Sequence, residues 1–408
     1  MPLLTNIDTL VTPPPPSAEA EASDLRTIED AALAWADDTI EWVGPAEDLP
    51  ATYEKVPEHD AEGHLVIPGL VDCHTHLAFA GWRADEFAMR LGGRSYQDIA
   101  TQGGGILDTV RKTRAASEAE LYDRSRSFLR AMAELGVTTV EAKSGYGLTV
   151  NDELKQLRVY RHLQEDHPLR IVPTLLGAHA VAPEYETDRQ GYLELLQAQL
   201  LPQVGQKNLA EFCDAFVEDG AFRPDEARRL FHTARQHGLT PKLHADQLSD
   251  TGGAALAAEV GAVSADHLEH ASAQGITKMA DAGVVAVSLP LATLHLDQDP
   301  LPVLAFREAG VPIAVATDFN PGTAPSYHLP LAMMLACTLQ RMSPAQALAG
   351  ATRHAAAALQ REDEIGSLAP GMQADFVLVD APSLNHWLYH FRPNAAVATY
   401  VRGERWPE

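Results

Sequence analysis

The sequence predicts an α/β protein, a (β/α)8 TIM barrel joined to a small composite β-sandwich domain built from both termini. Three observations predict it. Eight apolar, strand-like runs alternate with helix-like segments, both chain ends are rich in short strand and turn signals, and polar residues recur where the eight runs end. With 408 residues, 46% of them apolar, the chain is long enough for one large domain and one small one.

The eight runs begin at Gly69 and end at Asn320. They read GLVDCHTH, GVTTVEAKS, RIVPTLLGAH, FCDAFVED, TPKLHADQ, AVSADHLEH, VVAVSLP and VPIAVATDFN. The helix-like segments include Glu118–Leu135, Asp152–Asp166, Pro224–His237 and Pro344–Leu359. The alternative is an open doubly wound sheet, but no GxGxxG turn follows a strand to support its nucleotide-binding form.

Both ends of the chain read as short strands joined by turns. TIEWVG and EGHLVIPG lie near the N-terminus, and DFVLVDAP and AAVATYVRGERW lie near the C-terminus. Pro13–Pro16 cannot sit in a central strand or a helix and predicts a loop. We therefore expect residues 1–66 and 365–408 to form the composite β-sandwich domain, and residues 67–364 to form the barrel.

The charge balance limits the partners of this chain. There are 31 basic and 56 acidic residues, a net charge of −25, which argues against nucleic acid as a partner. An anionic small molecule would need a local arginine within this repelling field. The N-terminus lacks a basic segment followed by an apolar run, and no stretch approaches about 18 uninterrupted apolar residues, so we expect no membrane partner and a cytoplasmic location.

Histidines and one aspartate stand at the ends of four of the eight runs. Residues i and i+2 on a strand share a face, so His74 and His76 both point into the predicted barrel mouth. His244, His267 and Asp318 end the fifth, sixth and eighth runs. A lone HxH motif is usually incidental, but in a barrel all these strand ends meet at one face. Their joint placement predicts a nitrogen- and oxygen-ligated metal site that suits zinc or iron.

These motifs resemble a known family. VIPGLVDCHTHL, His244, His267 and ATDFNPGT resemble the amidohydrolase superfamily, and GSLAPGMQADFVLVD resembles its C-terminal sandwich strand. HLAFAGWRADEF, GGRSYQDIATQGGGI, EAKSGYGL, LGAHAVAPEY, HADQLSDTGG, SADHLEH and TDFNPGTAPS are similar to the imidazolonepropionase branch. The resemblance implies hydrolysis of the cyclic amide C–N bond of 4-imidazolone-5-propanoate to N-formimidoyl-L-glutamate, a reaction of histidine degradation. It also implies a homodimer.

The resemblance also implies a ligand set and two catalytic residues. Binuclear members of the superfamily bridge two ions with a carboxylated lysine on the fourth strand, and FCDAFVED has no lysine. One Zn2+ or Fe3+ per subunit is therefore expected, held by His74, His76, His244 and Asp318. Asp318 and His267 are the expected catalytic residues: Asp318 moves protons, and His267 orients the attacking water or stabilises charge on the carbonyl oxygen. Lys143 ends the second strand and is expected to form an ion pair behind the ligands.

Residues in the loops after the strands are the expected substrate contacts. Arg83 is expected to hold the propionate, although an arginine there could also be an ordinary surface residue. The other expected contacts are Tyr96, Tyr146, His179, Gln247, Asn320, Gly322 and Thr323. Two alternatives remain: a deaminase, which needs a glutamate where this chain has Gln247, and a non-catalytic assembly barrel, which would have lost metal ligands.

Overall fold

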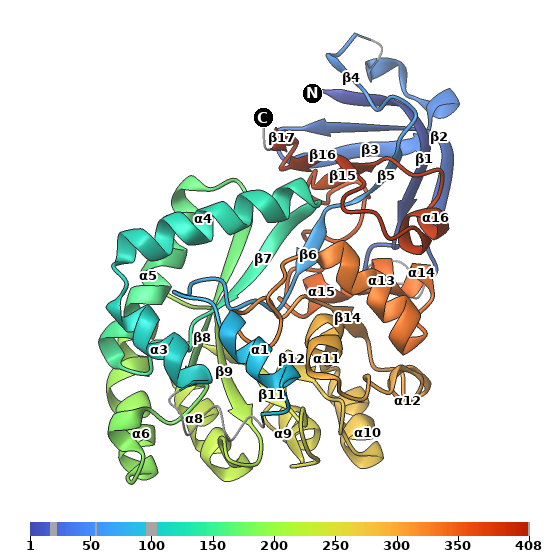
Figure 1. Cartoon of the computed structure of the whole chain (residues 1–408). Helices are drawn as coiled ribbons and strands as arrows, with labels where there is room; N and C mark the ends of the chain where they lie inside the picture. Colours follow the sequence, from blue (N-terminus) through green and yellow to red (C-terminus); the bar gives the residue numbers. More distant parts are fainter. Residues whose placement is uncertain (17–22, 54, 95–103, 407–408) are drawn as a thin grey trace.

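The computed structural model describes residues 1–16, 23–53, 55–94 and 104–406. A parallel barrel surrounded by helices forms the larger part, and a mixed sheet that contains both chain ends lies beside it (Figure 1). The predicted fold class is therefore confirmed. Among the described residues, no helix combines the length and the apolar character needed to cross a membrane.

Each of the eight predicted runs contributes to the barrel. Neighbouring strands pair in the order β14-β13-β12-β11-β9-β8-β7-β6, all in parallel, and β10 pairs with β9. The Asp318 amide donates to the His74 carbonyl at 3.0 Å, and the His76 amide donates to the Phe319 carbonyl at 2.8 Å. These bonds join the last strand to the first. The strands are β6 Leu70–Asp72, β7 Val137–Lys143, β8 Arg170–Ala178, β9 Phe212–Val217, β10 Thr240–Pro241, β11 Leu243–Ala245, β12 Ser264–His267, β13 Val285–Ser288 and β14 Ile313–Val315.

Helices cover the outside of the barrel. Three predicted helices match α4, α5 and α8 to within two residues. The described helices are α1 Ala84–Leu91, α3 Ile106–Ala115, α4 Glu118–Glu134, α5 Val150–Asp166, α6 Arg189–Leu195, α7 Leu201–Gln206, α8 Pro224–Gln236, α9 Gly253–Glu259, α10 Ala273–Ala282, α11 Pro290–Leu296, α12 Val303–Glu308, α13 Leu329–Gln340, α14 Pro344–Gly350, α15 Arg353–Ala357 and α16 Leu384–Tyr389. Short helical turns cover 46–48, 51–53 and 183–185, and a π-helical turn covers 196–200.

The predicted single helix Pro344–Leu359 is wrong, because the structure has two helices there, α14 and α15. The break falls at Thr352, whose φ of −132° and ψ of −92° are not helical. The carbonyl of Ala351 accepts a hydrogen bond from the Val71 amide at 2.8 Å. A contact with barrel strand β6 thus replaces the next helical hydrogen bond, and a local sequence pattern contains no sign of it.

The smaller part is one mixed sheet with strands from both ends of the chain. Its order is β17-β16-β15-β5-β1-β2-β3, with β4 beside β1. Phe376 stacks on Tyr400 at 4.4 Å between ring centroids, and Trp35 packs edge-on against both. The strands are β1 Leu3–Thr12, β2 Arg26–Ala36, β3 Thr39–Pro45, β4 Glu58–Asp60, β5 Leu65–Pro68, β15 Phe376–Val379, β16 Ala396–Val401 and β17 Glu404–Trp406. The domain boundaries after residues 66 and 364 stay a prediction.

Candidate active site

The five residues predicted from the strand ends lie together at the C-terminal face of the barrel. His74 and His76 follow β6, His244 lies in β11, His267 ends β12, and Asp318 follows β14. All five are almost fully buried, at 0–3% exposure. Asp318 Oδ1 lies 3.3 Å from His74 Nε2 and 3.4 Å from His76 Nε2, and the His74 and His244 rings are 4.5 Å apart.

The donor atoms of this cluster suit a metal ion. Two groups of three ligands, each with its ligand atoms within 4.8 Å of one another, share His74: one adds His76 and Asp318, the other adds His244 and His267. His74 Nε2, His244 Nε2 and His267 Nδ1 are buried with no hydrogen-bond partner among the described residues. Buried ring nitrogens are normally paired, so their convergence fits a cation that completes their bonding.

The backbone is strained where these side chains leave the strands. Asp246, His267, Leu268 and Asp318 have φ values of 48°, 78°, 69° and 55°. Residues other than glycine rarely adopt this left-handed region, and such strain is retained where the surrounding structure holds it in place, often at functional sites. These residues lie at the ends of three different barrel strands, and two of them, His267 and Asp318, belong to the shared cluster.

Burial and neighbouring charges set the protonation of the cluster. Burial lowers the pKa of His267 to about 3 and that of His76 to about 4. Burial and Lys143 also act to lower the pKa of His74, but Asp266 and Asp318 outweigh them and raise it to about 9. Burial raises the pKa of Asp318, yet its close contacts with the His74 and His76 rings hold that pKa well below its usual range. Asp318 is therefore ionised, as a ligand or a proton acceptor must be.

Two aspartates that the sequence analysis did not single out contact two of the histidine rings. Asp266 Oδ2 lies 2.6 Å from His74 Nδ1, and Asp214 Oδ2 lies 2.9 Å from His244 Nδ1. A carboxylate on Nδ1 fixes the tautomer and turns Nε2 toward a metal. Asp266 directly precedes His267 in the sequence, and Asp214 lies in the fourth run. Neither position by itself indicates which histidine ring the carboxylate contacts in the folded protein. The ion pairs predicted for Lys143 are confirmed, because Lys143 is fully buried beside both aspartates.

Tyr146 and His179 form one wall beside the cluster. The His179 ring stacks on His76 with centroids 5.1 Å apart and an interplanar angle of 17°, and Tyr146 lies 5.5 Å from His179 and 5.7 Å from His76. His179 Nδ1 contacts the Gly145 carbonyl at 3.2 Å. A side chain at Gly145, whose φ is 109°, would meet the His179 ring, so the loop after β7 needs glycine there. The structure thus brings both predicted contacts next to the cluster.

Glu153, another residue that the sequence analysis did not single out, fixes the loop that carries Tyr146. Its carboxylate accepts hydrogen bonds from the amides of Gly145, Gly147 and Leu148 at 2.8–3.0 Å. Gln156, one turn further along α5, accepts from the Tyr146 amide at 3.1 Å. Both side chains are fully buried. The first turns of α5 therefore hold the loop main chain in place, a role that no strand-end pattern predicts.

Replacing Glu153 with glutamine is expected to raise the KM for 4-imidazolone-5-propanoate, the substrate that the resemblance implies, about tenfold or more. The reason is that an amide nitrogen would face one of the backbone donors and shift Tyr146. Unfolding should also become easier by roughly 1–3 kcal/mol, the cost of an unsatisfied buried donor. Steady-state kinetics and thermal melts measure both effects. Asp152→Asn, on the same turn but partly exposed, is the control, and equal kinetics for the two variants would contradict the role of Glu153.

Gln247 lies in a loop that its neighbours hold firmly. Asp246 accepts hydrogen bonds from the amides of Thr251, Gly253 and Ala254, which fixes the start of α9. Glu218 accepts from the Leu248 amide at 2.8 Å. Gln247 itself is 8% exposed. The loop is thus anchored on both sides of Gln247, whose role as a substrate contact stays a prediction.

Arg83 lies against the loop that follows Asp318. Its amide donates to the Pro321 carbonyl at 3.2 Å, and its guanidinium covers Gly322 so closely that any Cβ there would overlap it. The Arg83 side chain is 8% exposed, and its Nε has no hydrogen-bond partner among the described residues. Among the described residues its nearest carboxylate, that of Glu86, is 4.0 Å away. A nearly buried cation with an unused donor fits an anionic group of a ligand.

Asn320 and Thr323 shape the same loop. Asn320 Oδ1 accepts hydrogen bonds from the amides of Gly322 and Thr323 at 2.8 and 2.7 Å. Its Nδ2 donates to the Asp318 carbonyl at 2.7 Å and to Thr323 Oγ1 at 2.9 Å. Its side chain is therefore occupied within the loop. A ligand contact by Asn320 would have to share these groups or use the main chain. The roles of Asn320, Gly322 and Thr323 as substrate contacts stay predictions.

Replacing Gly322 with alanine is expected to displace the Arg83 guanidinium and raise KM roughly 10- to 100-fold, with little change in the melting temperature. The physical reason is steric, since the new Cβ occupies the place of the guanidinium. The double variant Gly322→Ala/Arg83→Gln should be no worse than Arg83→Gln alone, because both changes remove one contact. Additive losses would show that Gly322 acts independently of Arg83.

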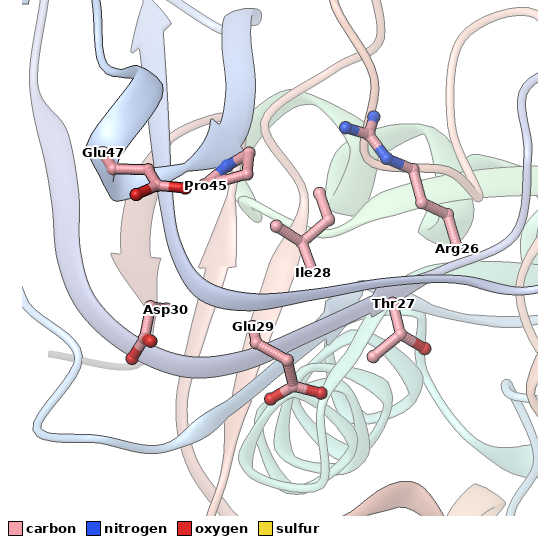
Figure 2. Close-up of a pocket in the computed structure, with 7 residues that line it drawn as sticks. All are labelled: Arg26, Thr27, Ile28, Glu29, Asp30, Pro45 and Glu47. Atoms are coloured by element: carbon pink, nitrogen blue, oxygen red, sulfur yellow. The ribbon is translucent and has the colours of Figure 1, made fainter.

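Two other features lie apart from this cluster. Tyr96, an expected substrate contact, falls outside the described residues. Figure 2 shows a cleft on the terminal sheet, lined by Arg26, Thr27, Ile28, Glu29, Asp30, Pro45 and Glu47. It arises because β3 pairs with β2 only from Ala31 onward, which leaves the start of β2 uncovered on that side. None of the predicted site residues lines this cleft.

Comparisons with known proteins agree with the fold and the strand-end motifs. The sequence profile of the Amidohydrolase family matches residues 65–405. The imidazolonepropionase of Symbiobacterium thermophilum is 48% identical over 93% of this chain and 91% of its own length. A mutant of atrazine chlorohydrolase from Arthrobacter aurescens, solved with zinc and atraton, covers 99% of this chain and 95% of its own at a TM-score of 0.73 and 18% identity.

A second solved structure, a zinc-bound adenosine deaminase from Xanthomonas campestris, covers 99% of this chain and 92% of its own at a TM-score of 0.72 and 20% identity. At such identities these structures support the fold alone, whereas the near-complete alignment at 48% identity is specific to one branch. The chain belongs to the amidohydrolase family and, within that family, to the imidazolonepropionases.

Proposed function

We propose that this protein is a metal-dependent hydrolase that cleaves the cyclic amide C–N bond of 4-imidazolone-5-propanoate and yields N-formimidoyl-L-glutamate, a reaction of histidine degradation. The observation that carries the proposal is the 48% identity to an imidazolonepropionase over nearly the whole of both chains. The buried histidine–aspartate cluster supports it, because hydrolysis of an unactivated amide needs both a water activator and a polarised carbonyl.

A divalent metal is supported by the family and by the convergent ring nitrogens. The finer proposal is one Zn2+ or Fe3+ per subunit, with His74, His76, His244 and Asp318 as ligands. Such an ion supplies a Lewis acid for the carbonyl and lowers the pKa of water. Strand β9 contains no lysine that could bridge a second ion. A homodimer and a cytoplasmic location belong to the same proposal.

The proton transfers are assigned to two side chains. Asp318, ionised and at the centre of the cluster, accepts the proton of the attacking water and passes it to the ring nitrogen that leaves. His267 is neutral, since burial lowers its pKa to about 3. A neutral imidazole offers one donor and one acceptor, so it can orient the water and stabilise charge on the carbonyl oxygen. This assignment balances the reaction with water as the only co-substrate.

The substrate is held at two places in this proposal. Arg83 binds the propionate, which satisfies the unused Nε and offsets the repulsion from the acidic chain. Gln247 contacts the N–C=O edge of the ring, for which an amide provides a matching donor and acceptor. Tyr146 and His179 border the ring, while Tyr96, Asn320, Gly322 and Thr323 complete the proposed contacts.

The experiment that tests the function uses purified protein whose metals have been quantified. Freshly prepared imidazolone propionate is added, and the loss of ring absorbance, the formation of formimidoylglutamate and the release of ammonia are followed together. Equimolar formimidoylglutamate without ammonia is the expected result. Ammonia release without formimidoylglutamate would mean a deaminase instead, and two metal ions per fully active subunit would contradict the single-ion proposal.

Replacing Gln247 with glutamate is expected to lower kcat/KM for the imidazolone about tenfold, without creating ring deaminase activity. The reason is that a carboxylate loses the donor to the carbonyl edge, a loss of about 1.4 kcal/mol. Gln247→Met, of similar size, should lose a similar factor. A glutamate variant that deaminates azole or purine rings and keeps full imidazolone hydrolysis would contradict the proposed role of Gln247.

A further inference from the structure

Five charged side chains lie directly behind the metal-binding cluster. We call Glu141, Lys143, Asp214, Lys242 and Asp266 the buried charge cluster; all five have 0% exposure. They come from β7, β9, the residue between β10 and β11, and β12. Charges are rarely buried to this extent unless each is paired, because the desolvation cost of each is several kcal/mol. Each of these five charges should therefore have a partner of opposite charge inside the barrel.

Lys143 is the centre of this cluster. Its Nζ lies 2.8 Å from Asp214 Oδ2, 2.9 Å from Glu141 Oε1 and 3.2 Å from Asp266 Oδ2. Burial alone would lower the pKa of Lys143, but the carboxylates around it hold that pKa well above its usual value. Lys143 is therefore an ammonium ion, and its three N–H donors face three carboxylates.

The same two oxygens that contact Lys143 also contact ligand histidines. Asp266 Oδ2 lies 2.6 Å from His74 Nδ1, and Asp214 Oδ2 lies 2.9 Å from His244 Nδ1. The opposite nitrogens, His74 Nε2 and His244 Nε2, have no hydrogen-bond partner among the described residues; His244 Nδ1 has none either, and its contact with Asp214 is a close ion-pair contact. One ammonium group thus connects the carboxylates behind two imidazoles from different strands.

The other buried lysine has a different role. Lys242 Nζ contacts Glu141 Oε2 at 2.9 Å and the Ala358 carbonyl at 3.1 Å. Among the described residues, Lys242 forms no ion pair with Asp214 or Asp266, although it lies in the same cluster. Lys143 and Lys242 are equally buried and share Glu141. They therefore form a matched pair, in which only Lys143 touches the carboxylates that orient the rings.

The charges of the cluster also favour a cation on the histidines. Two ammonium groups stand against three carboxylates, which leaves one net negative charge in a region without solvent. Removing Lys143 would leave three carboxylates and one ammonium group, with the oxygens of Asp214 and Asp266 within 4.8 Å of each other. Like charges at that separation repel strongly in a medium of low polarity. At least one carboxylate would then turn away and release its histidine.

We propose that Lys143 is a positioning residue for the metal centre: its ammonium group holds Asp214 and Asp266 in the orientation in which His74 and His244 present Nε2 to the same ion. The proposal rests on the metal site of the proposed function, but not on the identity of the substrate. Lys143 acts through the two aspartates and touches neither the ion nor the substrate. Partners behind metal ligands typically contribute a factor of roughly 10–100 to metal affinity.

The test compares Lys143→Met with Lys242→Met in the full-length protein. Zn2+ affinity is measured by competition with a chromophoric chelator, the absorption bands of Co2+-loaded protein are recorded, and the melting temperature is measured with and without metal. Both variants should melt at lower temperature, since each loses one buried ammonium. Lys143→Met should bind Zn2+ about 10- to 100-fold more weakly and shift the Co2+ bands, while Lys242→Met should stay within about threefold of the parent with unchanged bands.

Equal losses of affinity in the two variants, or a Lys143→Met affinity within twofold of the parent, would overturn the proposal. If Lys143→Met does not fold, Asp266→Asn keeps the size of the side chain and should weaken Zn2+ by a similar factor. Where all variants fold, the double variant Lys143→Met/Asp266→Asn should be less than additive, because both changes act on His74. These readouts contain no substrate, so a failure of the proposed reaction would leave them interpretable.

Discussion

Replacing Asp318 with asparagine is expected to lower kcat/KM for imidazolone propionate by about a thousandfold or more, because the ionised carboxylate is both the proposed ligand and the proposed proton carrier. Asparagine has nearly the same shape but cannot accept a proton. Asp318 Oδ1 stands 3.3 Å from His74 Nε2 and 3.4 Å from His76 Nε2, at the centre of the cluster. Steady-state kinetics, with metal content measured on the same samples, gives the answer.

Asp297 provides a matched control for this substitution. It is an exposed aspartate with the same φ of 55°, at the end of α11. Asp297→Asn makes the same chemical change in the same backbone conformation, outside the cluster, and should keep full activity. An Asp318→Asn variant within tenfold of the parent, at equal metal content, would rule out Asp318 as the proton carrier.

Replacing Arg83 with glutamine is expected to lower kcat/KM about 100-fold, mainly through KM. A charge-assisted contact with the propionate is worth roughly 1.5–3 kcal/mol, and every 1.4 kcal/mol changes binding tenfold. The guanidinium is nearly buried. Within the part of the chain that the structure describes, its Nε has no hydrogen-bond partner and the closest carboxylate is 4.0 Å away. The loss should therefore appear in substrate binding and not in folding, as a melting curve would verify.

A neutral analogue separates charge recognition from other effects of this substitution. The parent enzyme should prefer the propionate over the corresponding propionamide by about 100-fold, and Arg83→Gln should lose most of that preference. Equal preference in both enzymes would mean that another cation holds the carboxylate. The expected result would also assign the loop after Asp318 to the tail of the substrate, since Arg83 packs against that loop.

The barrel and the histidine–aspartate cluster could be predicted because both depend on local sequence patterns. Eight apolar runs with helical segments between them define parallel strands, and the geometry of a barrel brings all their C-terminal ends together. His74 and His76 share a face because side chains alternate along a strand. The same reasoning predicted that His244, His267 and Asp318 would lie at the C-terminal face of the barrel, beside His74 and His76.

Local patterns fail where a side chain serves a partner on another element. Glu153 reads as an ordinary acidic residue in the first turn of a helix, yet its carboxylate binds three loop amides. Asn320 is expected from the sequence to contact the substrate, yet its side chain is occupied by its own loop. Helix α14 ends because Ala351 bonds to a barrel strand. None of these contacts follows from composition or periodicity.

By itself, the sequence determined the fold class, the face of the barrel that carries the chemistry and the residue types gathered there, because strand period and parallel order are local properties. The tertiary structure alone decided which groups control those residues. His74 and Asp266 are 192 positions apart, and Lys143 joins carboxylates from two further strands. Pairing between buried charges depends on distances through the folded interior, where low polarity makes each contact strong. That interior exists only once all eight strands have closed the barrel.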